Sequence, residues 1–218
     1  MLGESKKEYL MFPKATLERL KLYHRLLSEE KEEYISSEEL GKRLGIPPEQ
    51  VRKDLSYLEY KGKPKVGYHV KSLLEELNRL FGLDKNVKVI IVGAGNLGTA
   101  LTNYPGFSNY NIEIVGIFDN DPAKIGRKVG DLVVLPLEYL GRVIKRFDVE
   151  IGVICVPKES AQEVANLLVE NGIKAIWNFA PALIKVPEDV IVRNEDITLG
   201  LLTLKHMLEV KNTQVKQG

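Results

Sequence analysis

The sequence predicts an α/β protein, with a helical N-terminal domain followed by a doubly wound parallel sheet. Up to residue 84, apolar residues recur at the spacing of amphipathic helices. Beyond it, short runs rich in Val and Ile each end in Gly, Pro or Asp, as buried parallel strands do. An apolar helical segment follows the last of these runs. We therefore expect three segments: residues 1–84, residues 85–195, and a C-terminal helix and tail over residues 196–218.

The composition excludes several classes of protein. A chain of 218 residues with 44% hydrophobic residues is long enough for two small domains and too apolar to be disordered. Its net charge of +1 gives no overall attraction to nucleic acids or membranes. Cys155 is the only cysteine, which excludes an internal disulfide and a multi-cysteine zinc site and suits the cytoplasm. Without a membrane-length apolar run or a signal peptide, we expect no membrane partner, and we expect no metal.

The first elements are helices with clear start and end signals. We expect a first helix after Pro13 and, beyond an acidic connection, a second helix that begins at a capping box. In that box the Ser36 hydroxyl accepts a hydrogen bond from the backbone N–H of Glu39. Gly45 supplies a left-handed residue at the end of this short helix, and two prolines then start a new direction.

A third helix is expected from about Pro48 to Tyr60. Val51, Leu55 and Leu58 fall on one buried stripe, at positions i, i+4 and i+7. The opposite face and its flanks are polar and basic, which suits contacts to phosphates and bases: Arg52, Lys53, Ser56, Tyr57 and Tyr60.

Residues 61–70 predict a small β-hairpin, because two glycines and a proline accompany an alternation of apolar and polar residues. The hairpin carries Lys63 and Lys65. A linking helix is expected to begin at a second capping box on Ser72 and to end at Gly82.

The charges are segregated along this domain. Residues 52–71 hold six basic residues against two acidic ones, whereas residues 28–39 hold six glutamates against one lysine. Helix, turn, helix and basic hairpin in this order predict a winged helix-turn-helix, with the second helix of the pair in the major groove of double-stranded DNA. A three-helix protein-interaction module with a solvated basic face is the alternative.

A glycine-rich turn follows the apolar strand at residues 88–92 and leads into a helix. Gly93 permits the tight turn, Gly95 lets a pyrophosphate approach the backbone, and Gly98 lets the helix pack closely on its strand. A glycine-rich turn without a ligand is the alternative. The motif predicts a Rossmann-type domain, and the residues expected to contact the cofactor there are Gly93, Ala94, Gly95, Asn96, Leu97 and Gly98.

A second strand, at residues 112–118, ends at Asp119, 21 residues beyond Gly98. A carboxylate at this position accepts hydrogen bonds from the adenosine ribose. It would repel the 2′-phosphate of NADP, and no arginine adjoins it in the sequence. We therefore expect NADH and NAD⁺ as the cofactors.

Further elements follow the same pattern, with strands expected at residues 131–135, 150–156 and 173–179 and a helix at residues 159–170. Val156, Pro157 and Asn178 lie at the carboxyl ends of these strands, where an open α/β sheet binds its ligand. We expect all three at the cofactor, although Asn178 could instead cap a loop.

An enzyme is disfavoured because no acid–base residue stands at a strand end of the predicted sheet. His24 and His69 fall in the first domain, and His206 falls in the tail. We interpret Lys158 as an exposed residue at a helix start and Cys155 as a small core residue. No catalytic residue is therefore expected.

Residues 197–210 predict a helix that is apolar around most of its circumference. Such a helix packs either into its own domain or against a second subunit. Because helix-turn-helix proteins usually read DNA as two-fold dimers, we favour a homodimer. One stripe of this helix consists of Ile197, Leu201, Leu204 and Leu208.

Several strings in the chain are specific: Val51-Arg52-Lys53-Asp54-Leu55-Ser56-Tyr57, Val66-Gly67-Tyr68, the glycine motif, Tyr104-Pro105-Gly106-Phe107, and Asn178-Phe179-Ala180-Pro181. With these strings, the chain resembles the Rex family of bacterial redox-sensing repressors from Pro13 to the terminal helix. The resemblance implies a homodimer that binds operator DNA when NADH is scarce and releases it when NADH binds. It also implies an exchanged C-terminal helix that inserts between the two domains of the partner.

The resemblance further implies roles for single residues. Tyr104 matches the tyrosine beside the nicotinamide, and Asp196 matches the aspartate that changes partner between states. Arg25 matches the arginine that pairs with this aspartate across the dimer, although without the family it would be interpreted as a solvated helix residue. Three residues match those that contact DNA from the recognition helix: Arg52, Lys53 and Ser56.

The wing departs from the family pattern. Rex proteins usually carry arginine and glycine before Val-Gly-Tyr, whereas this chain has Pro64 and Lys65. Because proline cannot donate to a hairpin ladder, we expect Lys63 and Lys65 to substitute at the DNA. Leu58 and Glu59 also replace a usual aromatic-glycine pair, which predicts a different end of the helix. Two rival functions are an NAD-dependent enzyme with an accessory helical domain and a CoA- or nucleotide-binding scaffold that does not bind DNA.

Overall fold

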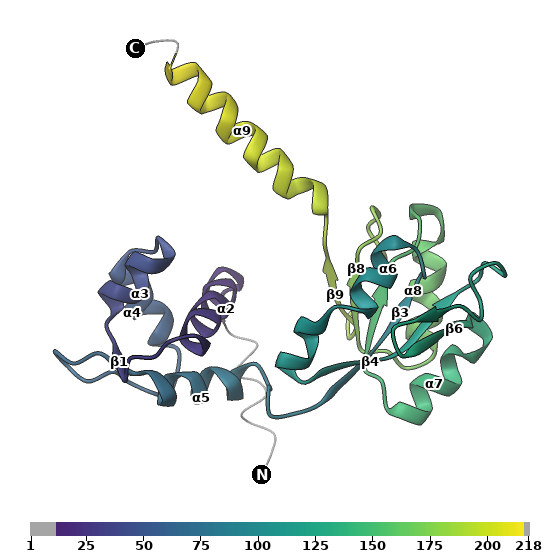
Figure 1. The fold of residues 1–218 in the computed structure, drawn as a ribbon, viewed down its shortest axis with the longest axis horizontal. Coiled ribbons are helices and arrows are strands. Elements are labelled where there is room, and N and C mark those ends of the chain that lie inside the picture. Colours follow the sequence, from purple (N-terminus) through teal and green to yellow (C-terminus); the bar gives the residue numbers. More distant parts are fainter. Residues whose placement is uncertain (1–11, 216–218) are drawn as a thin grey trace. The chain divides into compact units, whose positions relative to one another are not determined.

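The computed structural model describes residues 12–215 and divides into two compact units, with the boundary between Lys85 and Asn86 (Figure 1). The first unit is helical and the second is built on a mostly parallel sheet, which confirms the predicted fold class. Each unit has its own hydrophobic core. None of the described helices is long and apolar enough to cross a membrane.

The described part of the first unit packs its helices around a core of apolar side chains. Leu20, Tyr23, Leu40, Val51 and Leu73 are fully buried in it. The helices are α2 (Lys14–Ser28), α3 (Ser37–Leu44), α4 (Pro48–Leu55) and α5 (Val70–Leu80), and the strands are β1 (Tyr34–Ile35) and β2 (Tyr68–His69).

The predicted start and end signals of the early helices are confirmed. α2 begins directly after Pro13. The Ser36 hydroxyl accepts a hydrogen bond of 3.0 Å from the backbone N–H of Glu39, which caps α3. Gly45 ends α3 with a φ of 68°, in the left-handed region that glycine favours.

α4 is shorter than predicted, since it ends at Leu55 and not near Tyr60. The Lys61 ammonium donates a hydrogen bond of 2.8 Å to the backbone carbonyl of Ser56 and so satisfies a carbonyl just beyond the helix. The Tyr60 hydroxyl accepts a hydrogen bond from the backbone N–H of His69. Tyr60 is therefore held against β2 and does not continue the polar face of the helix.

The hairpin is present, but its strands pair differently from the prediction. Lys63 and Gly67 form the base of a tight turn through mutual backbone hydrogen bonds. β2 then pairs with β1, which lies in the acidic connection where no strand is predicted. A side chain at Gly67 would collide with the backbone of β1, so this pairing requires glycine there. Val70 already begins α5, which the His69 side chain caps in place of Ser72.

A buried carboxylate joins α4 to α2. The Asp54 side chain is fully buried and accepts hydrogen bonds from Arg19 through both Nε (2.6 Å) and Nη2 (2.7 Å). Tyr23 (2.8 Å), Gln50 (2.9 Å) and Thr16 (3.2 Å) donate to the same carboxylate. Burial alone would raise the pKa of Asp54, but the hydrogen bonds, with that from Arg19 the strongest, hold it below its ordinary value.

The second unit is built on a sheet whose described strands have the order β5-β6-β4-β3-β7-β8-β9. All neighbouring pairs are parallel except β5 with β6. Chain order reverses between β3 and β7, which makes their junction the switch point of the sheet. The strands are β3 (Val87–Val92), β4 (Ile112–Asp119), β5 (Lys128–Val129), β6 (Leu132–Pro136), β7 (Ile151–Ile154), β8 (Ala175–Asn178) and β9 (Ile191–Asn194).

Helices cover both faces of this sheet. They are α6 (Asn96–Thr102), α7 (Leu140–Phe147) and α8 (Ala161–Glu170). The C-terminal helix, α9 (Ile197–Val215), follows β9 and does not belong to either core cluster of the sheet. On β3, Ile90 and Val92 belong to the core shared with α7 and α8, whereas Val89 and Ile91 belong to the core that includes Leu101 of α6. The short edge strands β5 and β9 are not predicted from the sequence, and α9 extends five residues beyond its predicted end.

The stability of the first unit should depend on Arg19. Arg19→Met leaves the Asp54 carboxylate buried without its cation, and we expect the free energy of unfolding at pH 7 to fall by about 3 kcal/mol. This value lies at the low end for a buried ion pair because the Arg19 side chain is 26% exposed. Urea denaturation followed by circular dichroism measures it. Lys21→Met removes an exposed, paired cation from the same helix and should cost less than about 0.5 kcal/mol.

The difference in the free energy of unfolding between wild type and Arg19→Met should also depend on pH. Because folding lowers the pKa of Asp54, its stabilising contribution is present above the ordinary pKa of aspartate and is lost as the pH falls through the folded-state pKa. In Arg19→Met the pKa of Asp54 should rise, so acid relieves the penalty. The stability gap should therefore be largest at neutral pH and should shrink below about pH 4. A gap that stays constant into acid would contradict this account.

Candidate functional site

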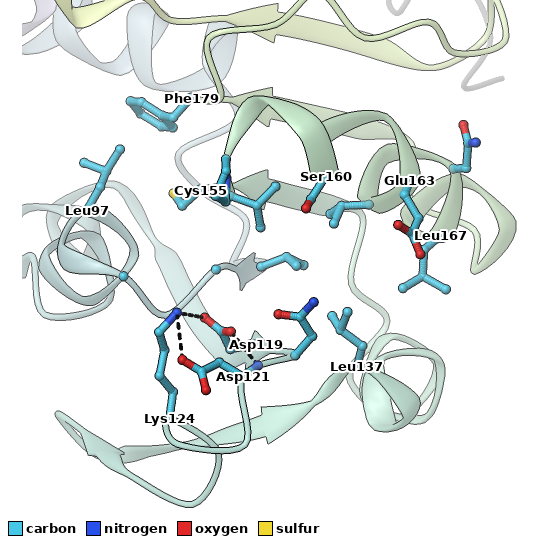
Figure 2. Close-up of a pocket in the computed structure, with 18 of the residues that line it drawn as sticks. Leu97, Asp119, Asp121, Lys124, Leu137, Cys155, Ser160, Glu163, Leu167 and Phe179 are labelled. Atoms are coloured by element: carbon cyan, nitrogen blue, oxygen red, sulfur yellow. Dashed lines mark hydrogen bonds and ion pairs between the residues drawn. The ribbon is translucent and has the colours of Figure 1, made fainter.

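A cavity of about 940 Å³ opens at the carboxyl ends of β3, β4 and β7 (Figure 2). It lies at the switch point of the sheet, where open α/β folds bind their ligands. A second hollow, of about 450 Å³, adjoins it and includes Ala94, while Gly98 packs behind the turn. The structure brings these predicted cofactor residues together in the lining of the main cavity: Gly93, Gly95, Asn96, Leu97, Asp119, Val156 and Pro157.

The glycine turn has the geometry that its motif predicts. Gly93 has a φ of 107°, and a β-carbon there would lie 2.4 Å from the carbonyl oxygen of Cys155. A β-carbon on Gly98 would lie 1.8 Å from the carbonyl oxygen of Gly93, so α6 packs directly against the turn. Gly95 instead faces open space, immediately before α6 begins at Asn96. The turn therefore leaves its backbone accessible to an anionic group.

Asp119 stands at the end of β4 and is 6% exposed. Its carboxylate accepts hydrogen bonds from the backbone N–H groups of Ala94 (2.8 Å) and Asp121 (2.9 Å) and from the Lys124 ammonium (2.9 Å). Burial alone would raise the pKa of Asp119, but these hydrogen bonds outweigh burial and lower it. Asp119 is therefore ionised at neutral pH and can accept further hydrogen bonds from ligand hydroxyl groups.

Lys124 is a site residue that the sequence analysis missed. Its ammonium lies 2.9 Å from the carboxylate of Asp119 and 3.8 Å from that of Asp121. Figure 2 shows the ammonium facing both carboxylates. The residues next to Asp119 in sequence are not basic, and Lys124 lies five residues further along the chain. Together with Arg127, Lys124 also lines the second hollow. The local signal that could have found it is the i,i+3 pairing of Asp121 with Lys124.

Cys155 also lines the cavity, next to Val156. Burial raises the pKa of its thiol to about 12, so the sulfur is a neutral thiol at physiological pH. A neutral thiol is a poor nucleophile, which agrees with the interpretation of Cys155 as a small packing residue.

Tyr104 does not line the cavity. It is 58% exposed, directly before a 3₁₀ turn at Pro105–Tyr110, and its ring centroid lies 5.2 Å from that of Phe107. Phe107 in turn lies 6.4 Å from Trp177, whose ring packs 4.5 Å from that of Phe179. Because Phe179 lines the cavity, a row of aromatic rings connects the cavity to Tyr104.

Asn178 is not in the cavity lining either, and its surroundings favour the alternative of a loop cap. Its side chain is fully buried. The amide nitrogen donates to the carbonyl oxygen of Ala182 (2.8 Å) and to the side-chain oxygen of Asn194 (2.9 Å), and the amide oxygen accepts from the backbone N–H of Ala180 (3.0 Å). Asn178 thus ties the loop after β8 to the end of β9.

The two residues that the resemblance pairs across a dimer lie in different units. Asp196 caps α9 by accepting hydrogen bonds from the hydroxyl and the backbone N–H of Thr198, and these bonds lower the pKa of its carboxyl. Arg25 is exposed in the last turn of α2. Both side chains are accessible in the single chain.

The polar face of α4 and the turn after it are exposed. The Ser56 hydroxyl donates a hydrogen bond to the backbone carbonyl of Lys53, and Arg52 forms an ion pair of 3.0 Å with Glu38 of α3. Because the Asp54 carboxylate is buried, it does not oppose the basic side chains at the surface. The exposed set is Arg52, Lys53, Ser56 and Tyr57.

Pro64 does not disrupt the wing. It lies in the turn between the paired residues Lys63 and Gly67, so its missing N–H removes no ladder hydrogen bond. Lys65 lies at the tip with a φ of 63°. Lys63 is exposed, with its ammonium 5.9 Å from the centre of the Tyr34 ring. Both lysines are accessible for contacts to DNA.

α9 leaves its apolar side chains uncovered in the single chain. An uncovered apolar surface of this kind marks an interaction site. The exposed residues, with exposed fractions from 44% to 68%, are Ile197, Leu199, Leu201, Leu202, Leu204, Met207, Leu208 and Val210.

The histidines lie away from the cavity lining. His24 interacts with Asn78 in the first unit, His69 caps α5, and His206 lies on α9. Among the residues that the structure describes, no cluster of His, Cys, Asp and Glu has the arrangement of a metal site.

Two family models match parts of the chain. A model described as the CoA binding domain matches residues 84–182, and one described as the N-terminus of a putative DNA-binding protein matches residues 12–56.

Relatives of known function match nearly the whole chain. The redox-sensing transcriptional repressor Rex 2 of Thermotoga maritima is 46% identical over 202 residues, which cover 93% of this chain and 98% of the relative. The crystal structure of RSP in complex with β-NADH has a TM-score of 0.85 at 39% identity, over 95% of this chain and 99% of RSP. RSP in complex with β-NAD⁺ and operator DNA has a TM-score of 0.87, over 94% and 96% of the two chains. With this identity over almost its entire length, the chain belongs to the Rex family of redox-sensing transcriptional repressors.

Proposed function

We propose that this chain forms a dimeric repressor that binds palindromic operator DNA when NADH is scarce and releases it when NADH binds. One observation carries the proposal: one chain combines an exposed basic helix face with a nucleotide-sized cavity that contains an ionised aspartate. Complexes of the related RSP with β-NADH, and with β-NAD⁺ and operator DNA, support the same ligands here. We assign residues 1–84 to DNA, 85–195 to the cofactor and 196–218 to the dimer, in a cytoplasmic protein.

The cofactor would extend along the carboxyl edge of the sheet. Asp119 accepts hydrogen bonds from the adenosine ribose, and the turn from Gly93 to Gly98 approaches the pyrophosphate. Val156 and Pro157 line the cavity on the side of β7. Tyr104 would reach the nicotinamide in the assembled dimer, supported from behind by the aromatic row that begins at Phe179.

DNA would be bound by α4 and the wing. α4 enters the major groove, where Lys53 neutralises a phosphate and Ser56 and Tyr57 contribute further contacts. In the wing, Lys63 and Lys65 would contact the DNA backbone or the minor groove.

Release of DNA requires NADH to bind one arrangement of the dimer better than the other, because a ligand of equal affinity shifts nothing. Exchange of α9 between subunits would cover its apolar side chains and bring Asp196 of one chain to Arg25 of the partner subunit. Closing the dimer would change the spacing of the two α4 helices. That spacing must match half-sites separated by about one helical turn of DNA or a multiple of it.

Two rival functions have less support. The relatives that match nearly the whole chain are transcriptional repressors, which favours a repressor over an NAD-dependent enzyme with an accessory helical domain. A CoA- or nucleotide-binding scaffold that does not bind DNA predicts no salt-dependent binding to duplexes, which a binding assay decides directly.

Asp119→Ala should weaken NADH binding at least about tenfold, because the ribose loses its charged acceptor. Fluorescence of Trp177, the only tryptophan, reports the titration because its ring packs against Phe179 of the cavity. Operator binding without cofactor should stay intact, since Asp119 lies in the other unit. Asp131→Ala, an exposed carboxylate outside the cavity lining, is the control. NADH affinity equal to wild type in Asp119→Ala would reject the assignment of the cavity.

Lys53→Ala should impair DNA binding and leave cofactor binding intact, the reverse of the effect expected for Asp119→Ala. We expect weaker operator binding by gel shift and unchanged NADH affinity. The slope of log affinity against log salt should be smaller by about 1.8, because the dimer loses one phosphate contact from each subunit. Lys21→Ala removes an exposed lysine from α2, where it pairs with Glu18, and should leave DNA binding unchanged. Operator affinity equal to wild type for Lys53→Ala would rule out α4 as the recognition helix.

The double variant Leu204→Glu with Leu208→Glu should convert the dimer to a monomer, because carboxylates cannot be buried in an apolar interface without a partner. Sedimentation velocity measures the change. Thr203→Glu with Lys205→Glu places two carboxylates on the same helix outside the apolar stripe and should remain dimeric. If the leucine double variant stays dimeric, α9 does not form the dimer interface.

A further inference from the structure

Arg52 is held by two residues of the preceding helix. Its Nη1 donates a hydrogen bond of 3.0 Å to the Ser37 hydroxyl and another of 3.0 Å to Oε1 of Glu38. The Ser37 hydroxyl donates in turn to Oε2 of Glu38, at 3.3 Å. These three residues form a network between the first turn of α3 and the last turn of α4.

The network uses only one nitrogen of the guanidinium. Among the residues that the structure describes, the side-chain hydrogen bonds of Arg52 all run through Nη1. A guanidinium has five N–H donors, two of them on each terminal nitrogen. The edge formed by Nε and Nη2 therefore keeps its parallel N–H groups, which match a pair of neighbouring acceptors.

On a base in the major groove, such an acceptor pair is the O6 and N7 of guanine, the commonest specific partner of arginine. We propose that Arg52 reads a guanine of the operator and that Ser37 and Glu38 are positioning residues that orient its guanidinium. The inference rests on the DNA-binding function proposed above and adds the base that is recognised and the residues that set the geometry.

The network has little to contribute to the stability of the fold. The Glu38 and Arg52 side chains are 67% and 52% exposed, and exposed ion pairs are weak. Its effect is on the freedom of the arginine, since a long side chain that is held before binding loses less entropy in the complex. Ser37, only 7% exposed, provides the fixed point at the start of α3.

The neighbouring Lys53 differs from Arg52 in the kind of DNA contact that its side chain suits. An ammonium on a flexible stem is a point charge and suits a phosphate, whereas a guanidinium held by one nitrogen presents a fixed planar edge. Lys53 would therefore supply affinity that is independent of sequence, and Arg52 would supply discrimination between bases.

Glu38 could instead only compete with DNA phosphates for Arg52. In that case its removal would raise the affinity for every duplex by the same factor. As a positioning residue, Glu38 affects one base pair in each half-site and leaves the others unchanged.

The test uses a duplex that the wild-type protein selects from a random-sequence pool. Each guanine of a half-site is replaced in turn by 7-deazaguanine, which removes the N7 acceptor and keeps base pairing. Fluorescence anisotropy at fixed salt compares wild type, Glu38→Gln and Glu39→Gln. Glu39 is the matched control because it is exposed, follows Glu38 on α3 and loses the same charge, yet makes no hydrogen bond to Arg52.

We expect wild type and Glu39→Gln to lose about tenfold in affinity at one guanine of each half-site. Glu38→Gln should lose less than about threefold there, with the salt dependence of wild type. Arg52→Lys keeps the positive charge but not the two parallel N–H groups. It should bind the duplex with 7-deazaguanine at that position as tightly as the unmodified duplex.

An equal loss in Glu38→Gln and wild type would overturn the positioning role, and the absence of any sensitive guanine would overturn the base assignment. A uniform gain of Glu38→Gln on all duplexes, beyond that of Glu39→Gln, would assign Glu38 to competition with phosphates and would also overturn the proposal. If the wild-type protein selects no duplex from the pool, the DNA-binding function itself fails, so the two failures are distinguishable.

Discussion

The position of α4 depends on one buried ion pair, between Asp54 and Arg19. The pair fixes α4 against α2, and the polar face of α4 acquires its orientation from this contact. It also removes a carboxylate from the surface, where its charge would oppose those of Arg52 and Lys53. The net charge of the whole chain is only +1, so a basic surface has to come from local arrangement. Burial of Asp54 is the step that makes the exposed face of this helix basic.

The second unit also contains a buried carboxylate that hydrogen bonds hold in its ionised form. Asp119 is buried at the end of β4, and hydrogen bonds from two backbone N–H groups and Lys124 keep it ionised. One of these N–H groups belongs to Ala94 in the glycine turn, so the carboxylate and the turn are held in a common geometry. A ribose acceptor and a pyrophosphate-binding backbone in a fixed relation are what a dinucleotide requires. The related RSP, a Rex-family repressor, forms complexes with β-NADH and with β-NAD⁺.

Elements with a complete local signal were predicted from the sequence. The capping residue Ser36, the left-handed Gly45, the strand before Gly93 and the strand that ends at Asp119 all carry their cause within a few residues. Elements that depend on a distant partner were missed or misplaced. β1 is two residues long and exists because β2 pairs with it, and α4 ends early because the chain after it folds back against β2. The same holds for Asn178, whose hydrogen-bond partners lie in the following loop and in β9.

The sequence by itself determined the division into a helical and a parallel-sheet unit, the glycine turn with its acidic partner, and the candidate residues on the polar face of α4. Periodicity, turn residues and motif spacing are properties of short segments, and they act before the chain is compact. Only the tertiary structure decided that Asp54 is buried by Arg19, that Lys124 lies beside Asp119, and that Ser37 holds Arg52 by one nitrogen. Lys124 reaches Asp119 through the turn that follows β4. The contacts of Arg19 with Asp54 and of Ser37 with Arg52 join side chains of separate helices, and the packing of helices is not encoded in any single segment.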